Sequence, residues 1–544
     1  MALTVKNFSF KYSTSENFSL KNCNLNISDG GFYLLCGKPG CGKTTLLRNI
    51  KREVAPSGKS SGEIVYNNTD IKELSPEISV REIGFISQNP SSQIVCDTVI
   101  SELAFGLENL GTDPWEIHGR IAEISSYFGL SKILHNDVET LSGGQKQLLN
   151  LAAVMVMQPK LLLLDEPLSQ LDPIAGTSFL SALKQLNDEL GITIVISEHR
   201  LEEILPICTG VLFMESGEVC FEGSSQNFFR FIRQNGRNSF IKSIPTSTRL
   251  FLECTQSDIN ENIPMTVKEG RKWLKGYFDG ADISVEEESP IEAIGDGDSI
   301  INVKNVWAGY EKKNPILRDL TFSINKGEIH AVVGANGAGK TTLLNVISGF
   351  IKPIHGKIVY KSKKIGLLFQ ELKGTFSFDS VRKELENVCS GNANTLNEHI
   401  EQFNLIDILD SHPYDISGGE GQRVALAKVM MRSPEVLLLD EPTKGMDAST
   451  KDFLGNKLVS LAQTGMAIVM VTHDLEFAAE FSNVCSIMFD GNLGETQNTK
   501  KFFSLNNYYT TGTVRLTRGI TPIKTTCEEM INWTLKQKLP KNTR

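Results

Sequence analysis

The chain has 544 residues, 40% of them hydrophobic and 22% charged, which is ordinary for a soluble globular protein of about three to four domains. The formal net charge of −9 argues against a general nucleic-acid binder, which is usually basic. The ten cysteines form no CxxC pair, so neither a zinc site nor an iron–sulfur cluster is expected. The start lacks the order of a signal peptide and no apolar run reaches the ~20 residues that span a bilayer, so any membrane role needs a partner.

The first pattern along the chain is a phosphate-binding loop. The apolar run FYLLCG ends at a glycine and KTTLL opens a helical pattern, which predicts strand, loop and helix. The stretch GKPGCGKT matches G-x(4)-G-K-[ST], in which backbone N–H groups surround phosphate oxygens. Lys43 is expected to bridge the terminal phosphates and Thr44 to hold Mg²⁺. The residues predicted to bind ATP here are Gly37, Lys38, Pro39, Gly40, Cys41, Gly42, Lys43, Thr44 and Thr45.

Three further strand ends carry polar residues suited to phosphate chemistry. Gln88 ends the run GFISQ, although a glutamine there could simply be solvated. The buried strands LLLLDEP and TIVISEH are typical of a mostly parallel sheet. Asp165 suits the Mg²⁺ shell and Glu166 suits orienting or deprotonating the attacking water. His199 is expected to sense the γ-phosphate, the alternative being a structural histidine.

A Ser-Gly-Gly before a helical pattern forms the most specific mark. Ser142, Gly143 and Gly144 offer a hydroxyl and bare N–H groups at a positive helix end, without a lysine. The phosphate-binding loop at residues 37–44 already supplies a partner for every phosphate of its own nucleotide. The anion bound by Ser-Gly-Gly is therefore expected to belong to another nucleotide. The polar, helical stretch between Gln88 and Ser142 predicts an inserted helical lobe, and VLFMESGEVCFEG predicts a strand, a turn and a strand.

All these landmarks recur in the same order, which predicts a tandem duplication. The offset falls from 297 residues between Lys43 and Lys340 to 274 between His199 and His473. Tyr12 and Tyr310 precede the two loops and could stack on adenine or lie at strand edges. The second set of predicted site residues comprises Gly334, Ala335, Asn336, Gly337, Ala338, Gly339, Lys340, Thr341, Thr342, Gln370, Ser417, Gly418, Gly419, Asp440, Glu441 and His473.

A fainter repeat closes each half. TVKEGRKW from Thr266 and TCEEMINW from Thr526 share the T-x-x-E signature of a helix start, unless the short match is coincidental. The acidic stretch EEESPIEAIGDGDS fits an exposed linker. We therefore expect ATP-binding domains at 1–240 and 299–505, a helical tail and linker at 241–298, and a C-terminal helical tail at 506–544.

In these motifs the chain resembles the ATP-binding subunits of ABC transporters, twice over, with D-loops at SQLD and KGMD. The resemblance implies an α/β fold of two P-loop NTPase ABC domains in tandem, each with a mostly parallel core sheet, an antiparallel β lobe and a helical lobe. It implies ATP and Mg²⁺ as cofactors, with Gln88 and Gln370 joining the metal shell. It also implies head-to-tail pairing within the chain, Lys43 with Ser417 and Lys340 with Ser142. Glu420 replaces the usual signature glutamine, and a modest effect is expected because the phosphate-touching residues remain.

A closer resemblance, to energy-coupling-factor importers, lies in QNPSSQIV, TVISELAFGLEN and EHRLEE. It implies an ATPase at the cytoplasmic face of the cell membrane, bound to an integral membrane scaffold subunit and a substrate-binding membrane subunit, with a vitamin, metal ion or similar micronutrient as cargo and no nucleic acid. The second half lacks the QNPxxQ pattern, so the two halves are expected to contact the partner differently. The alternatives are a soluble tandem ATPase acting on the ribosome or DNA, and a tandem sugar-importer ATPase.

Overall fold

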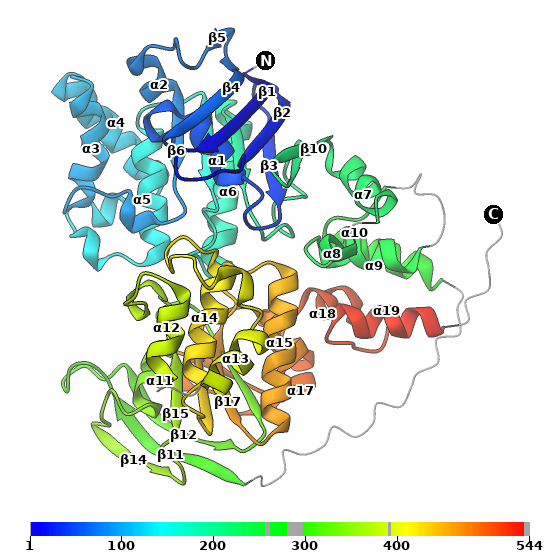
Figure 1. Cartoon of the computed structure of the whole chain (residues 1–544). Helices are drawn as coiled ribbons and strands as arrows, with labels where there is room; N and C mark the ends of the chain where they lie inside the picture. The colour runs from blue at the N-terminus through cyan, green and yellow to red at the C-terminus, as the bar shows by residue number, and fades with distance from the viewer. Residues whose placement is uncertain (1, 237, 256–261, 280–297, 390–392, 538–544) are drawn as a thin grey trace. The chain divides into compact units, whose positions relative to one another are not determined.

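The computed structural model describes residues 2–236, 238–255, 262–279, 298–389 and 393–537 (Figure 1). The chain divides into two compact units. The first comprises Met1–Pro245 and Ile259–Ile263, and the second comprises Thr246–Asp258 and Pro264–Arg544. The predicted acidic linker lies outside the described residues. No helix in the described ranges is both long enough and apolar enough to cross a membrane.

An antiparallel sheet opens the first unit, in the order β2-β1-β4-β5. Its strands are β1 (Leu3–Tyr12), β2 (Leu20–Ile27), β4 (Gly58–Tyr66) and β5 (Thr69–Asp70). Alternation along β1 buries Leu3 and Val5 against the core, while the shifted register after Val5 returns Phe8 and Phe10 to the same face. This sheet is the predicted β lobe.

The core sheet of the first unit has the order β10-β9-β3-β8-β7-β6. Its strands are β3 (Phe32–Gly37), β6 (Ile83–Ile86), β7 (Leu161–Asp165), β8 (Thr193–Ser197), β9 (Gly210–Glu215) and β10 (Glu218–Gly223). All neighbours are parallel except the β9–β10 hairpin, whose turn was predicted. Every residue of β7 and β8 is buried, and the carboxyl ends of β3, β7 and β8 bring the predicted site residues to one edge.

Helices cover this sheet and build the predicted helical lobe, which lies to the left of the first unit in Figure 1. The lobe contains α3 (Val99–Asn109), α4 (Pro114–Tyr127) and α5 (Gly143–Met155). Thr98, Asp113 and Ser142 cap their first turns with side-chain oxygens. The other helices are α1 (Lys43–Ile50), α2 (Pro76–Glu82), α6 (Pro173–Leu190), α7 (Ser225–Gln234) and α8 (Asn238–Ile241).

The second unit repeats this plan. Its antiparallel sheet, β12-β11-β14, contains β11 (Ser299–Ala308), β12 (Leu317–Asn325) and β14 (His355–Tyr360). Its core sheet runs β15-β16-β17-β13-β18-β19, the same topological order as in the first unit, with β20 also pairing β18. These strands are β13 (Ile329–Val333), β15 (Ile365–Leu368), β16 (Val436–Asp440), β17 (Ala467–Thr472), β18 (Val484–Phe489), β19 (Asn492–Leu493) and β20 (Gln497–Asn498).

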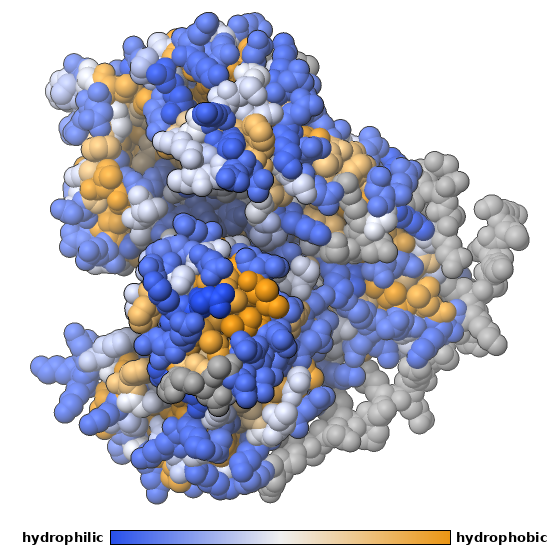
Figure 2. All heavy atoms as spheres, in the orientation of Figure 1, coloured by the Kyte–Doolittle hydropathy of each residue, from blue (hydrophilic) through white to orange (hydrophobic). Residues whose placement is uncertain are grey.

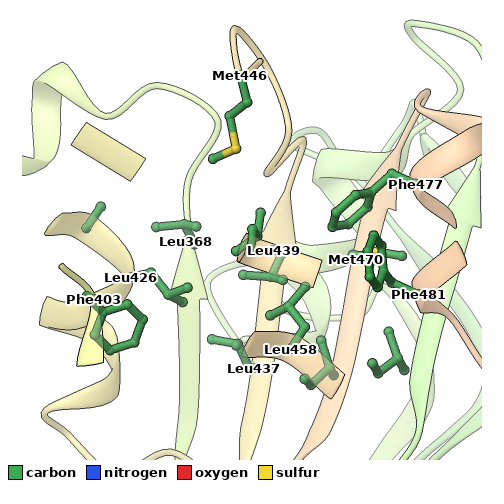
Figure 3. Packing of buried hydrophobic residues seen from close by; sticks show 14 of the residues in the cluster. Leu368, Phe403, Leu426, Leu437, Leu439, Met446, Leu458, Met470, Phe477 and Phe481 are labelled. Carbon is green, nitrogen blue, oxygen red and sulfur yellow. The ribbon is translucent and has the colours of Figure 1, made fainter. Parts of the chain in front are cut away.

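The helices of the second unit pack against both faces of its core sheet. They are α11 (Lys340–Ile347), α12 (Val381–Val388), α13 (Ala393–Gln402), α14 (Gly418–Met430), α15 (Ala448–Gln463), α16 (Leu475–Phe481) and α17 (Thr499–Leu505). Figure 3 shows Met470 of β17 beside the rings of Phe477 and Phe481, and Leu437 and Leu439 on the neighbouring strand β16. On the surface in Figure 2, hydrophilic side chains dominate and an apolar patch lies over α14 and α15.

Four short helices from the two predicted tails form a separate apolar cluster within the second unit. They are α9 (Thr246–Cys254), α10 (Val267–Tyr277), α18 (Gly512–Thr517) and α19 (Cys527–Lys536). Both predicted capping boxes are present, at Thr266 and Thr526. Leu250 and Leu274 are buried in the same cluster as Met530 and Trp533, and α9 and α10 belong to the second unit although their sequence follows the first repeat.

Candidate functional site

Each P-loop joins the end of a central strand to a helix, as predicted. Gly42, at φ 105°, is the residue before α1, and a Cβ there would lie 2.9 Å from the carbonyl oxygen of Ser19. Glycine is therefore required both by the conformation and by the space. Lys43 is buried, and its Nζ donates to the carbonyl oxygens of Gly37 (3.1 Å) and Lys38 (3.3 Å). These bonds hold the ammonium over its own loop, where a terminal phosphate would lie.

The second loop has the same construction. Gly339 also has φ 105° before α11, and Lys340 Nζ donates to the carbonyl oxygens of Gly334 (2.8 Å) and Ala335 (3.2 Å). Lys340 Nζ additionally lies 3.6 Å from Glu441 Oε1. Each loop thus presents a buried lysine and a helix N-terminus to the same space, which is the arrangement that binds a polyphosphate.

A hydroxyl and a carboxylate meet beside each loop, where Mg²⁺ was predicted. Thr44 Oγ1 donates to Asp165 Oδ1 over 3.0 Å, and Thr341 Oγ1 donates to Asp440 Oδ2 over 2.8 Å. Ser197, opposite Asp165 in the sheet, donates a second bond to Asp165 Oδ1. Burial raises the pKa of Asp165, and these two bonds oppose that shift.

The corresponding carboxylate of the second unit has no second donor among the described residues. Val471 stands opposite Asp440, and within the described part of the chain the buried Asp440 Oδ1 has no hydrogen-bond partner. Burial raises the pKa of Asp440 to about 6, against the opposing effect of Thr341. A buried oxygen acceptor that no protein donor satisfies is suited to a hard cation, so the residues present fit Mg²⁺.

The acidic residue that follows each of these aspartates adopts a strained backbone conformation. Glu166 has φ 46° and Glu441 has φ 48°, which costs a non-glycine residue about 1–3 kcal/mol. The backbone N–H of each donates to the neighbouring strand, Glu166 to Ser197 and Glu441 to Val471, both over 3.0 Å. This conformation recurs in both units, and in each of them the glutamate carboxylate lies beside a histidine ring, that of His199 or His473.

The predicted glutamate and histidine of each unit form a pair, which the sequence analysis did not anticipate, and the two pairs use different ring atoms. Glu166 Oε1 lies 2.7 Å from His199 Nε2, whereas Glu441 Oε2 lies 2.7 Å from His473 Nδ1. Burial raises the pKa of each glutamate, but the bond to its histidine and the nearby positive charges outweigh burial, so the net pKa is lowered in both units. Both carboxylates are therefore ionised at neutral pH and able to accept a proton or orient a water.

The two predicted strand-end glutamines are placed differently. Gln88 Nε2 donates to Glu166 Oε2 over 2.9 Å. Gln370 is exposed and makes no hydrogen bond to the described residues. The loop after Gln88 is closed by Gln93, whose Oε1 accepts from Ser87 N (2.9 Å), and by Asn150 of α5, whose Nδ2 donates to a carbonyl of the loop over 3.0 Å.

A buried glutamate also closes this loop in both units: in the first, Glu102 accepts from Val95 N (3.0 Å) and Cys96 N (2.9 Å). In the second unit the corresponding glutamate has a lysine partner. Glu384 is fully buried and accepts from the backbone N–H groups of Ser377 and Phe378. Lys428 of α14 lies 2.5 Å from Glu384 Oε2 and donates to Thr375 O over 2.8 Å. The sequence analysis did not identify Gln93, Asn150 or this ion pair. The sequence signal for the two buried glutamates was an acidic residue four positions after a hydroxyl residue: Glu102 in TVISE and Glu384 in SVRKE.

The Ser-Gly-Gly residues begin α5 and α14. Ser142 Oγ accepts from Gln145 N over 3.3 Å, and Ser417 Oγ accepts from Glu420 N over 3.4 Å. Glu420 preserves the capping box but also accepts the Ser417 hydroxyl over 2.7 Å. The glutamate thus engages the hydroxyl predicted to meet a phosphate, and it adds a negative charge beside Gly418 and Gly419.

The two predicted adenine-stacking tyrosines differ in their contacts. Tyr12 is half-buried, and its hydroxyl lies 2.9 Å from Thr45 Oγ1 of α1. Tyr310 is 68% exposed. Tyr12 is therefore oriented by the P-loop helix, whereas Tyr310 presents most of its ring to solvent.

With this geometry established, the chain can be compared with known proteins. The ABC transporter family model matches residues 20–169 and 317–444. A Bacillus anthracis protein described as an ABC transporter ATP-binding protein is 42% identical over 97% of both chains. The chain belongs to the ABC transporter family. It is a tandem ABC ATP-binding protein, and its two α/β NTPase domains are those of ATP-hydrolysing enzymes that bind ATP and generally require Mg²⁺.

Other relatives and structures resemble this ABC protein. The Bacillus subtilis HMP/thiamine import ATP-binding protein YkoD is 30% identical over 92% of both chains. The archaeal ribosome recycling factor aABCE1, solved in complex with ribosomal stalk protein aP1, matches over 92% of this chain and 91% of aABCE1, with a TM-score of 0.57. The sequence identity is 19%, so this likeness shows the fold alone. CbiO1 from Clostridium perfringens is 30% identical over 44% of this chain and 95% of its own, with a TM-score of 0.39.

Proposed function

We propose that this ABC protein is the energy-coupling ATPase of a membrane importer of the energy-coupling-factor type, and that its cargo is a vitamin, metal ion or similar micronutrient. The observation that supports a working motor is that each unit has a complete set of lysine, threonine–aspartate pair, and glutamate–histidine pair. The import role is supported by the name of the HMP/thiamine relative and by the QNPSSQIV and EHRLEE segments. The ATP-binding domains in this proposal are residues 1–240 and 299–505.

The roles follow from the contacts in each unit. Lys43 and Lys340 bridge the terminal phosphates of ATP. Thr44 with Asp165, and Thr341 with Asp440, would hold Mg²⁺, and the ion when bound would supply positive charge to offset that of the phosphates. Glu166 and Glu441 take the proton of the attacking water or orient it, while His199 and His473 hold those carboxylates in place.

The pairing of the two halves is also part of the proposal. Each ATP lies between the P-loop of one half and the Ser-Gly-Gly of the other, so that Lys43 works with Ser417 and Lys340 works with Ser142. This arrangement explains why one chain carries two loops and two lysine-free anion sites at helix N-termini. Binding of ATP at both sites then favours one arrangement of the halves and hydrolysis favours another, which drives the membrane partner.

The substitution Ser142→Arg tests this pairing. A bulky side chain at the start of α5 is expected to reduce nucleotide crosslinking at the Lys340 loop by about tenfold or more, and to leave the Lys43 loop much less affected. The measurement is the amount of 8-azido-ATP attached to peptides of each loop, determined by mass spectrometry. Ser417→Arg should show the reverse pattern. Ser142→Ala, which removes only the hydroxyl, controls for loss of the helix cap, and equal losses at both loops in Ser142→Arg would refute the pairing.

The membrane role is tested by its partners. Affinity purification of the chain from solubilised membranes should recover an integral scaffold subunit and a small substrate-binding membrane subunit. Mass spectrometry would identify both subunits, and the identity of the substrate-binding subunit would indicate the cargo. Recovery of ribosomal proteins instead would favour the alternative of a soluble tandem ATPase. The likeness to aABCE1 does not support that alternative because it shows the fold alone.

A further inference from the structure

The residue that precedes the glutamate-bound histidine is a buried acid in the first unit and a threonine in the second. In the first unit it reads Ser197-Glu198-His199, and in the second Val471-Thr472-His473. Glu198 is only 3% exposed. Its Oε1 accepts from Leu168 N over 2.7 Å, and its Oε2 accepts from His199 N over 3.1 Å. One carboxylate thus joins the backbone before the D-loop to the backbone of the histidine.

The second unit distributes the same backbone donors differently. Thr472 has a single hydroxyl, and its Oγ1 accepts from Asp474 N over 3.0 Å. The backbone N–H of His473 donates instead to Glu441 Oε2 over 3.2 Å, the oxygen that also faces the His473 ring. In the first unit Glu198 takes that donor, and Glu166 Oε2 accepts from Gln88. Where the residue before the histidine is Glu198, it accepts from the histidine N–H; where that residue is Thr472, the N–H donates to Glu441 instead.

Burying Glu198 next to another acid is energetically unfavourable. Burial, followed by the negative charge of Glu166, raises the pKa of Glu198 to about 7. A neutral residue would fill this space at lower cost, as Thr472 does in the second unit. A second link runs parallel to the first, because Arg200 Nη1 donates to Leu171 O over 3.2 Å. A buried acid that bonds to two functional segments at this cost indicates a role in positioning rather than in packing.

We infer that Glu198 is a positioning residue of the first ATP site: it fixes His199 and the start of the D-loop relative to Glu166, and the second site works without it. This inference rests on the proposed ATP hydrolysis at both loops. Glu198 contacts neither P-loop lysine nor the Thr44–Asp165 pair, so it acts on the hydrolytic step through His199 and not on the binding of ATP. It follows that the two sites hydrolyse ATP at different rates although both have a glutamate and a histidine.

The test is to replace Glu198 in the full-length protein by the residue of the second unit. In a Glu441→Gln background, in which only the first site hydrolyses ATP, Glu198→Thr is expected to lower kcat about tenfold and to change KM less than about twofold, because histidine placement is lost while the phosphate-binding loop is intact. Glu198→Gln keeps the shape and one of the two acceptors, and should give an intermediate kcat. Glu203→Thr removes an exposed acid of the same segment and should behave as the unsubstituted protein.

Phosphate release and thermal unfolding would be measured together on all variants. An unchanged kcat in Glu198→Thr would overturn the positioning role. So would a rise in KM together with a fall in melting temperature. If Glu198→Thr does not fold, the same criteria apply to Glu198→Gln. Absence of turnover in the unsubstituted protein would overturn the proposed ATPase function itself, and this inference with it. Normal turnover in the unsubstituted protein with no effect at position 198 would overturn the inference alone.

Discussion

Replacing Glu166 and Glu441 together by glutamine is expected to lower ATP turnover by at least about 100-fold while ATP remains bound. Glutamine keeps the size of each side chain and can still bond to its histidine, but it has no ionised carboxylate to take the proton of the attacking water. The lysines and the Thr–Asp pairs remain, so the nucleotide is held without being cleaved. The measurements are the rate of phosphate release and the amount of ATP retained after rapid gel filtration.

The control for this double substitution is Glu108→Gln, an exposed glutamate of α3, which should leave turnover unchanged. Each of the two single substitutions leaves one complete glutamate–histidine pair, so the turnover that remains in it reports the contribution of the intact site. Turnover near the normal rate in the double variant would show that neither glutamate acts as the base.

Replacing Lys428 by methionine is expected to destabilise the helical lobe of the second unit by about 3–5 kcal/mol, the cost of leaving one member of a buried ion pair without its partner. Glu384 is fully buried, and Lys428 is the cation beside it at 2.5 Å. Methionine fills much the same volume, so the loss is mainly electrostatic. Chemical denaturation, together with hydrogen exchange in α12 and α14, would measure the change.

The double variant Lys428→Met with Glu384→Gln should recover part of this loss, because it removes the unpaired charge yet keeps an acceptor for Phe378 N. Lys364→Met breaks the exposed pair with Glu435 and should have no measurable effect. A change below about 1 kcal/mol in Lys428→Met would contradict the prediction, because the ion pair would then contribute little to the stability of this lobe.

Much of the fold and of the two P-loops could be predicted because the signals are local. An apolar run, a glycine-rich turn and a helical pattern fix a strand–loop–helix unit, and both T-x-x-E starts gave the expected capping boxes at Thr266 and Thr526. The duplicated order of landmarks matched the common strand order of the two core sheets. These features depend on residues within a few positions of one another.

The remainder depends on which residues meet across the fold. Glu198 in EHRLEE contributed only to a family resemblance, and nothing in its neighbours indicated that it would bond to Leu168, 30 residues earlier. Gln88 and Gln370 begin loops that are held by different residues of α5 and α14, Asn150 and Lys428, which have no common sequence pattern. The choice of ring nitrogen in the two histidines likewise follows from tertiary placement.

The clustering of α9 and α10 with α18 and α19 has a consequence for how the protein is made. Leu250 and Met530 belong to one apolar cluster but are separated by 280 positions, so their contact has a high loop-closure entropy and forms late. During synthesis the first unit can fold as soon as it leaves the ribosome, whereas the apolar faces of α9 and α10 wait until the last helices emerge. The interval between those events is when the nascent chain is most exposed to aggregation and to chaperones, and interrupting translation before residue 527 would leave those faces uncovered.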